Sequence, residues 1–204
     1  MCDTKKAQDL PAVFVSAKTK VPVPVGHPAL RDALIQATLD PRVQSIDYIA
    51  SVRVASAVVT LDAVIIEFED GRYVLDVVPA RPVRDIDDEG LMLIALGELE
   101  LKPLILTEEE IRSEPRRGNA NLIWTYSDLT VPVGLRMRIL QALLDEGPIQ
   151  LGQLLKSMAG ESDPAAAVMA LACANLVCLD LVAGPLSPTT LVTYCAGKRT
   201  HHEF

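Results

Sequence analysis

Two aspartates in neighbouring strand-like runs are the residues of this chain best placed for chemistry. Asp62 lies within the apolar run 58–68, and Asp76 lies within the run 72–78. Asp70-Gly71 separates the runs and is typical of a hairpin turn. Carboxylates that face inward side by side repel each other, which raises the pKa of one of them unless a cation lies between them. The pair could therefore hold Mg²⁺; the alternative is that both acids are ordinary solvated side chains.

A second group of polar residues precedes two aromatic residues. Arg116, Arg117 and Asn119 come shortly before Trp124 and Tyr126. Arginine offers forked donors to phosphate, and tryptophan offers a face on which a base can stack. The three polar residues are thus candidates for nucleic-acid binding. In the alternative interpretation they form a polar turn, and the aromatics pack a domain junction.

The elements around these residues have local signals in the first half of the chain. A helix is expected over 27–39, ended by Asp40-Pro41, and strands are expected within 43–59 and in both runs of the hairpin. The later elements are a helix over 87–99 with Leu91, Ile94, Ala95 and Leu99 facing inward, a short buried strand over 102–107, and a helix capped by Thr107 and Glu110. This order predicts an α/β fold with a sheet covered by helices.

The second half of the chain has a different pattern. After a linker at 130–134, helices are expected over 135–146, 149–159 and 164–176, followed by strands over 177–182 and 190–194. Three helices followed by a β-hairpin is the order of a winged helix. The third helix contains no basic residue, so it cannot read base edges in the usual way.

The hairpin, the helix and strand after it, and the segment 110–126 resemble the TnsA-type endonucleases of transposons, which are PD-(D/E)XK, restriction-endonuclease-like proteins. The resemblance covers about 27–126, and the winged helix after it matches the two-part plan of that family. It implies an α/β restriction-endonuclease-like mixed sheet flanked by helices, plus a small winged-helix domain. The expected boundaries are an extended N-terminal arm (1–26), the endonuclease-like domain (27–127), the winged-helix domain (133–195) and a tail (196–204).

The resemblance also assigns roles to four positions. In that family a helix glutamate and two strand acids hold Mg²⁺ near the scissile phosphate, and a lysine two residues past the second acid orients the charged groups. Asp62 and Asp76 match the strand acids, while Leu30 stands where the glutamate would be and Val78 where the lysine would be. We therefore expect a catalytically degenerate protein without a cofactor, or with Mg²⁺ if the site works.

Two other functions compete with this interpretation. The first is an active Mg²⁺-dependent DNA endonuclease with a relocated lysine, for which Lys18, Lys20 and Lys102 are the candidates. The second is a winged-helix DNA-binding regulator. The net charge of −8 and the pI of about 4.9 disfavour tight DNA binding, because neutralised phosphates supply most non-specific affinity. A binding or assembly module linked to DNA transactions, with weak DNA affinity of its own, is the function that we expect.

Composition also predicts compartment and assembly. The four cysteines show no CxxC pair or zinc-ligand spacing, which favours free thiols in a reducing compartment. The sequence shows no signal peptide and no apolar stretch of transmembrane length, so we expect a soluble cytoplasmic protein that does not enter a membrane. The apolar third helix and the Val/Pro-rich arm favour self-association as a homodimer or binding to another protein.

Overall fold

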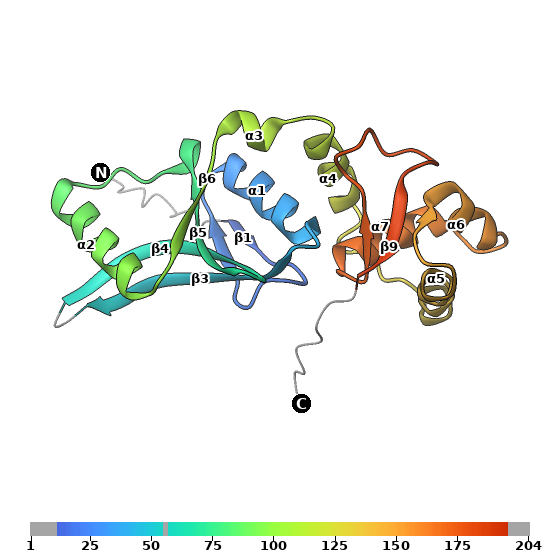
Figure 1. Cartoon of the computed structure of the whole chain (residues 1–204), viewed down its shortest axis with the longest axis horizontal. Coiled ribbons are helices and arrows are strands. Elements are labelled where there is room, and N and C mark those ends of the chain that lie inside the picture. Colours follow the sequence, from blue (N-terminus) through green and yellow to red (C-terminus); the bar gives the residue numbers. More distant parts are fainter. Residues whose placement is uncertain (1–11, 55–56, 196–204) are drawn as a thin grey trace, which may run out of the picture.

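The computed structural model describes residues 12–54 and 57–195 (Figure 1). The elements up to the crossover helix are β1 (Ala12–Phe14), β2 (Val23–Val25), α1 (Pro28–Leu39), β3 (Val43–Val54), β4 (Ala57–Phe68), β5 (Gly71–Val77), η1 (Val78–Ala80) and α2 (Ile86–Glu98). The remaining elements are β6 (Lys102–Leu106), α3 (Glu108–Arg112), α4 (Arg116–Trp124), α5 (Val133–Glu146), β7 (Ile149–Gln150), α6 (Leu151–Ser157), α7 (Pro164–Cys173), β8 (Val177–Leu179) and β9 (Leu191–Tyr194).

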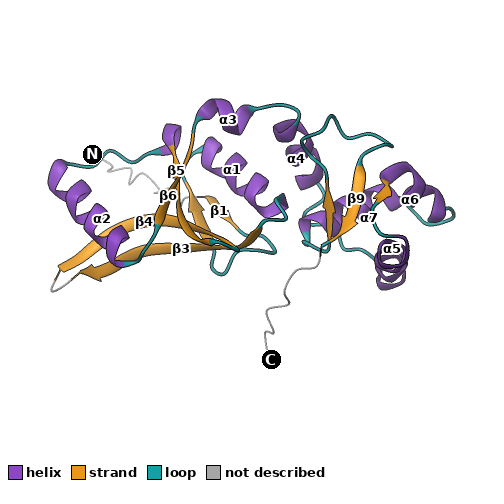
Figure 2. Cartoon of the chain, viewed as in Figure 1, coloured by secondary structure: helices purple, strands orange, loops and turns teal. Residues whose placement is uncertain are grey.

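A four-stranded mixed sheet organises the N-terminal half of the molecule (Figure 2). Its strand order is β3-β4-β5-β6; the first three strands are antiparallel, and β6 runs parallel to β5. A parallel pair needs a crossover connection, which α2 supplies. Successive residues of β4 enter different hydrophobic clusters: Val64 packs with α1, whereas Ala63 and Ile65 pack with Ala95 of α2. Helices therefore flank the sheet, which confirms the predicted α/β class.

The predicted inward face of α2 is right for two of its four residues, Ala95 and Leu99, and wrong for Leu91 and Ile94. Ala95 is fully buried, but Leu91 and Ile94 are exposed to solvent. Leu96 and Leu99 pack only partly against the sheet. Apolar residues occur on all sides of this helix, so periodicity cannot select the face that meets the sheet. Strand β6 was likewise expected to be buried, yet it pairs only with β5 and is half exposed.

The described part of the expected N-terminal arm belongs to the core. Strands β1 and β2 form a two-stranded antiparallel sheet whose residues Phe14, Val23 and Val25 are buried. The ring of Phe14 stacks on that of Trp124 with a centroid distance of 5.1 Å. Alternation in a strand places both valines of Val23-Pro24-Val25 on one face, and that face meets α1. The described part of this segment is thus extended, as expected, but it packs on the core through β1 and β2.

The C-terminal half has the predicted order of three helices followed by a two-stranded hairpin. A short additional strand, β7, joins the hairpin in the order β7-β9-β8. Residues 166–173 of α7 are all buried, against α1, α4 and α5 of the same chain. The apolar surface of this helix, which suggested a homodimer, is thus covered within the chain. One continuous hydrophobic cluster includes α1, α4, α5 and α7, and the expected linker at 130–134 is shortened because α5 begins at Val133.

The cysteines differ from the prediction of free thiols. Cys178 and Cys195 form a disulfide, with their Cα atoms 5.6 Å apart, because the pairing of β8 with β9 brings them together. Cys173 is free and buried, as expected for a small core residue. Cys2 and the predicted tail at 196–204 lie outside the described residues. Over 12–54 and 57–195, none of the helices has the length and apolar character required to cross a membrane.

Candidate functional site

Asp62 stands at an irregularity in the long hairpin of β3 and β4. Between the pairs Ile49–Ala63 and Ser51–Thr60, β4 contains one residue more than β3, which makes a β-bulge. Asp62 lies in this bulge and has a φ of 45°, in the left-handed region that aspartate tolerates better than most residues. Bulges often re-aim a side chain at the edge of a functional site. Here the bulge places the carboxylate of Asp62 at the exposed surface.

The carboxylate of Asp62 accepts a hydrogen bond from a tyrosine on the neighbouring strand. The distance from Tyr48 Oη to Asp62 Oδ1 is 2.6 Å. Partial burial and this hydrogen bond to a carboxylate raise the pKa of Tyr48 to about 12. The phenol therefore stays protonated at neutral pH and remains a donor to Asp62.

Asp76 is held by an arginine rather than a lysine. Arg81 Nε donates to Asp76 Oδ1 over 2.7 Å, and Arg81 Nη2 donates to Asp76 Oδ2 over 2.5 Å. The hydrogen bond to Asp76 raises the pKa of Arg81, so the guanidinium is always charged. A two-pronged pair of this kind fixes geometry as well as charge. Both oxygens of the second strand acid are thus occupied by a cation from its own chain.

A single cavity of about 360 Å³ brings the predicted site residues together. Asp62 and Asp76 line it, and so does Leu30 of α1, at the position where the resemblance implies a glutamate. The cavity is also lined by Arg81, Arg84 and Glu89. The two aspartates and Leu30 therefore line the same cavity. Within residues 12–54 and 57–195, three or more His, Cys, Asp or Glu side chains nowhere come close enough to hold a metal ion together.

The position of the missing lysine lies outside the strand. Strand β5 ends at Val77, and Val78 begins the short helix η1 with an exposed side chain. In the part of the chain that the structure describes, no lysine lines the cavity. Lys20 Nζ lies 2.8 Å from Glu67 Oε2, and Lys102 Nζ lies 5.8 Å from the centre of the Tyr73 ring. These lysines are engaged elsewhere on the sheet, and Arg81 takes the cationic position beside Asp76.

Sequence reasoning missed three polar residues of the cavity. Arg81 follows Asp76 by five residues, and the turn of η1 folds it back onto the strand. The flanking prolines, Pro79 and Pro82, are the signal that could have indicated this reversal. Arg84 Nη2 donates to the backbone oxygen of Leu61 over 2.8 Å. Neither this contact nor the position of Glu89 has a local sequence signal, because both depend on how α2 crosses the sheet.

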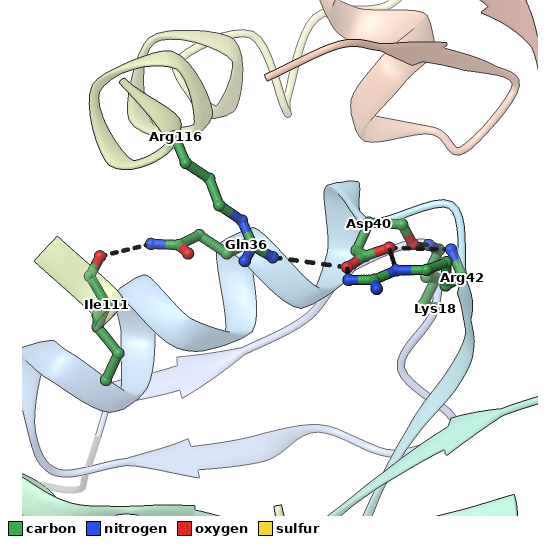
Figure 3. Close-up of polar contacts among 6 residues, drawn as sticks. All are labelled: Lys18, Gln36, Asp40, Arg42, Ile111 and Arg116. Carbon is green, nitrogen blue, oxygen red and sulfur yellow. Dashed lines mark hydrogen bonds and ion pairs between the residues drawn. The ribbon is translucent and has the colours of Figure 1, made fainter. Parts of the chain in front are cut away.

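The predicted nucleic-acid residues lie on α4, in a helix rather than a polar turn. Arg116 Nη2 forms an ion pair with Asp40 Oδ2 at 3.5 Å (Figure 3). Asp40 also accepts two hydrogen bonds from the side chain of Arg42, at 3.0 and 2.7 Å. Lys18 Nζ donates to the backbone oxygen of Asp40 over 2.6 Å. Arg116 is therefore part of a polar junction that ties α4 and the β1–β2 loop to the end of α1.

Burial and ion pairing shift the pKa values of the charged groups in this junction. Burial alone would raise the pKa of Asp40, but the hydrogen bonds and charge of Arg42, together with the charge of Arg116, hold it below its usual range. Lys18 is only 4% exposed, and its burial lowers the pKa of the ammonium to about 8 although the charge of Asp40 acts in the opposite direction. Gln36, also buried, donates from Nε2 to the backbone oxygen of Ile111 over 2.7 Å (Figure 3).

The two other predicted contact residues make internal bonds. Arg117 Nε donates to Asp32 Oδ2 of α1 over 3.1 Å. Asn119 is 5% exposed, and its Nδ2 donates to the backbone oxygens of Leu181 and Gly184 at 2.9 and 2.8 Å. Its Oδ1 accepts from the backbone N–H of Leu186 at 3.0 Å. Asn119 thus holds the loop between β8 and β9 and leaves no amide hydrogen for a phosphate.

Comparison with known proteins does not place the chain in a family. No protein-family model matches the sequence, and no curated protein matches it. The resemblance to TnsA-type endonucleases consequently depends on the positions and spacing of the residues described above.

Proposed function

We propose that this protein is a catalytically degenerate relative of the TnsA-type endonucleases, which acts as a binding or assembly module in DNA transactions. The bidentate pair of Arg81 with Asp76 is the observation on which this proposal depends. In an active site of that family this acid would hold Mg²⁺. Here a metal ion would have to displace a guanidinium that already satisfies both carboxylate oxygens.

Two further features of the cavity support the loss of chemistry. Leu30 lines the cavity where the family resemblance implies a metal-binding glutamate, and an aliphatic side chain has no oxygen to offer. Val78 replaces the lysine and lies beyond the end of β5. Removal of one preorganised charged group from such a site costs about 10²–10³ in rate, and two such groups are replaced here.

The C-terminal half gives little support to the proposal of an independent DNA-binding regulator. The third helix of a winged domain usually enters the major groove, but α7 is buried within the chain. Arg116 and Arg117 are bound to acids of the same chain and are only partly exposed. DNA contact by these arginines remains a proposal of a weak, secondary role.

Nicking of supercoiled plasmid in Mg²⁺ or Mn²⁺ tests the proposal. We expect the wild-type protein to give no more nicked product than the Asp62→Ala variant. Glu69→Ala removes an exposed acid in the hairpin turn and provides a matched control. Circular dichroism of each variant confirms that a negative result does not come from unfolding.

Robust wild-type cleavage that Asp62→Ala abolishes and Glu69→Ala retains would show an active nuclease and reject the proposal. The same experiment on Arg81→Ala tests whether Arg81 assists cleavage or only forms an ion pair with Asp76. If Arg81 had taken over the function of the lysine that Val78 replaces, the wild-type protein would cleave and Arg81→Ala would abolish cleavage. If Arg81 only occupies the acid, we expect no cleavage either before or after its removal.

A further inference from the structure

The outward face of α2 is apolar, as a buried helix face would be, although nothing in residues 12–54 and 57–195 covers it. At the helical repeat of 100° per residue, Ile86, Gly90, Leu93 and Gly97 share one side, and Ile94 borders it. Ile86 is 90% exposed, Leu93 60% and Ile94 55%. The outer side of a surface helix is normally charged or polar, and a helix that is apolar all round is normally buried.

Two glycines on this face have no explanation within the described chain. Glycine destabilises a helix interior relative to alanine. An added Cβ at Gly90 or at Gly97 would meet no atom within 4 Å, so no contact within the described structure requires the absence of a side chain. Glycine does, however, allow the backbone of a partner to approach closely.

The charged residues of α2 and its two ends are all acidic, whereas Arg81 and Arg84 lie on the side of the cavity. Between residues 85 and 100 there is no lysine or arginine, and the acids are Asp85, Asp87, Asp88, Glu89, Glu98 and Glu100. Those at the start of α2 complement the helix dipole, and Asp85 caps the helix by accepting from the backbone N–H of Asp88. Glu98 and Glu100 lie at the opposite end, where the dipole disfavours a negative charge. Neither has an ion-pair partner among the described residues.

We propose that the outward face of α2 binds an amphipathic, basic helix of another protein, whose apolar stripe packs across Gly90 and Gly97 between Ile86, Leu93 and Ile94. The acidic residues at both ends would then face lysines or arginines of the partner. A second copy of this chain fits poorly, because both ends of α2 are acidic and either orientation would bring like charges together. An anionic membrane surface fits poorly for the same reason.

This surface adjoins the cavity of Asp62 and Asp76. Leu93 belongs to the outward face and also lines the cavity, so a helix bound there would lie beside the candidate site. The surface is at the end of the molecule opposite to α5 and α6 (Figure 1). The inference deepens the proposed function and rests on it, since it names the kind of partner that a binding or assembly module would hold.

Calorimetry with synthetic helical peptides tests the inference on the full chain. The probe is a leucine/lysine amphipathic peptide of about 18 residues, long enough to be helical. The comparison is a leucine/glutamate peptide with the same leucine stripe. We expect saturable binding of the lysine peptide, at least about tenfold weaker binding of the glutamate peptide, and weakening by salt.

Variants of the chain test whether the peptide binds to the outward face of α2. Leu93→Ser should weaken it at least about tenfold, whereas Leu144→Ser, which changes a leucine of α5 that is 59% exposed, should leave it unchanged. The double variant Gly90→Ala, Gly97→Ala should raise the melting temperature and yet weaken binding, a combination that loss of folding cannot produce.

Several results would overturn the inference. These are the absence of saturable binding to the lysine peptide, equal binding of both peptides, and binding that Leu93→Ser leaves intact. A dimer of the free chain that Leu93→Ser dissociates, or binding to lipid vesicles that it abolishes, would assign the face to a second copy or to a membrane instead. All of these outcomes are independent of plasmid nicking, so failure of the inference and failure of the proposed function can be told apart.

Discussion

The buried ammonium of Lys18 predicts a measurable dependence of stability on pH. In the unfolded chain this lysine has a pKa of 10.5, whereas in the folded protein burial lowers the pKa to about 8. Above about pH 8 the folded state releases its proton while the unfolded state keeps one. Stability therefore rises with pH in this window, because the unfolded state binds more protons.

The magnitude follows from the two pKa values. Below pH 8 both states are charged, and the lowered pKa of Lys18 disfavours folding by a constant amount. Between pH 7 and pH 9 the folded ammonium becomes mostly neutral, which corresponds to a gain of about 1 kcal/mol in the free energy of unfolding. Lys18→Met lacks this titration. The variant also leaves the backbone oxygen of Asp40 without its donor, but that cost does not depend on pH.

Urea unfolding of wild type and Lys18→Met at pH 7, 8 and 9 provides the assay. From pH 7 to pH 9, the free energy of unfolding of the wild type should rise by about 1 kcal/mol relative to that of the variant. Burial raises the pKa of Cys173 to about 11, which lowers stability at high pH, but this effect is common to both proteins and cancels. Lys20→Met, which changes an exposed lysine, should follow the wild-type curve. Parallel curves for wild type and Lys18→Met would refute a lowered pKa for the buried ammonium.

Two further predictions concern the C-terminal half. Asn119→Ala removes three hydrogen bonds to the loop after β8 and should lower the free energy of unfolding by about 2–4 kcal/mol. Asn121→Ala, on the same helix, is the control and should have little effect. Equal losses of stability in the two variants would contradict the role of Asn119. Reduction of the disulfide between Cys178 and Cys195, which are 17 residues apart, should cost about 3 kcal/mol. The urea midpoint with and without reductant measures this cost, and a Cys178→Ser, Cys195→Ser variant that still responds to reductant would argue against the pairing.

Elements with strong local signals could be predicted from the sequence. A hairpin joins β4 and β5 as expected, although its two turn residues are Glu69 and Asp70 and Gly71 already begins β5. Asp40-Pro41 ends α1, and Thr107 with Glu110 forms a complete capping box. Each of these depends on contacts within a few residues. The side chain of Asp163 also caps α7 by accepting from the backbone N–H of Ala166, as its place before Pro164 indicated.

The errors share a dependence on contacts that are distant in sequence. Helix α4 is polar and contains Gly118, so its local pattern does not indicate a helix; its first residues are held by Asp32 of α1 and by Asp40, the residue that ends α1. The disulfide depends on the pairing of β8 with β9, and cysteine spacing alone does not reveal it. In the candidate site, the convergence of Asp62 and Asp76 followed from the hairpin. The pairing of Arg81 did not, because it depends on how η1 turns back against β5.

The bonds of Asn119 have a practical consequence for anyone who wishes to study the two halves apart. Division of the chain near residues 127–133 would remove the packing of α1 and α4 against α7. It would also leave the side-chain amide of Asn119, and the three backbone groups that it bonds in the loop after β8, without partners. Each fragment would then expose apolar surface and unpaired polar groups that are buried in the full chain, so we expect neither half to fold stably alone.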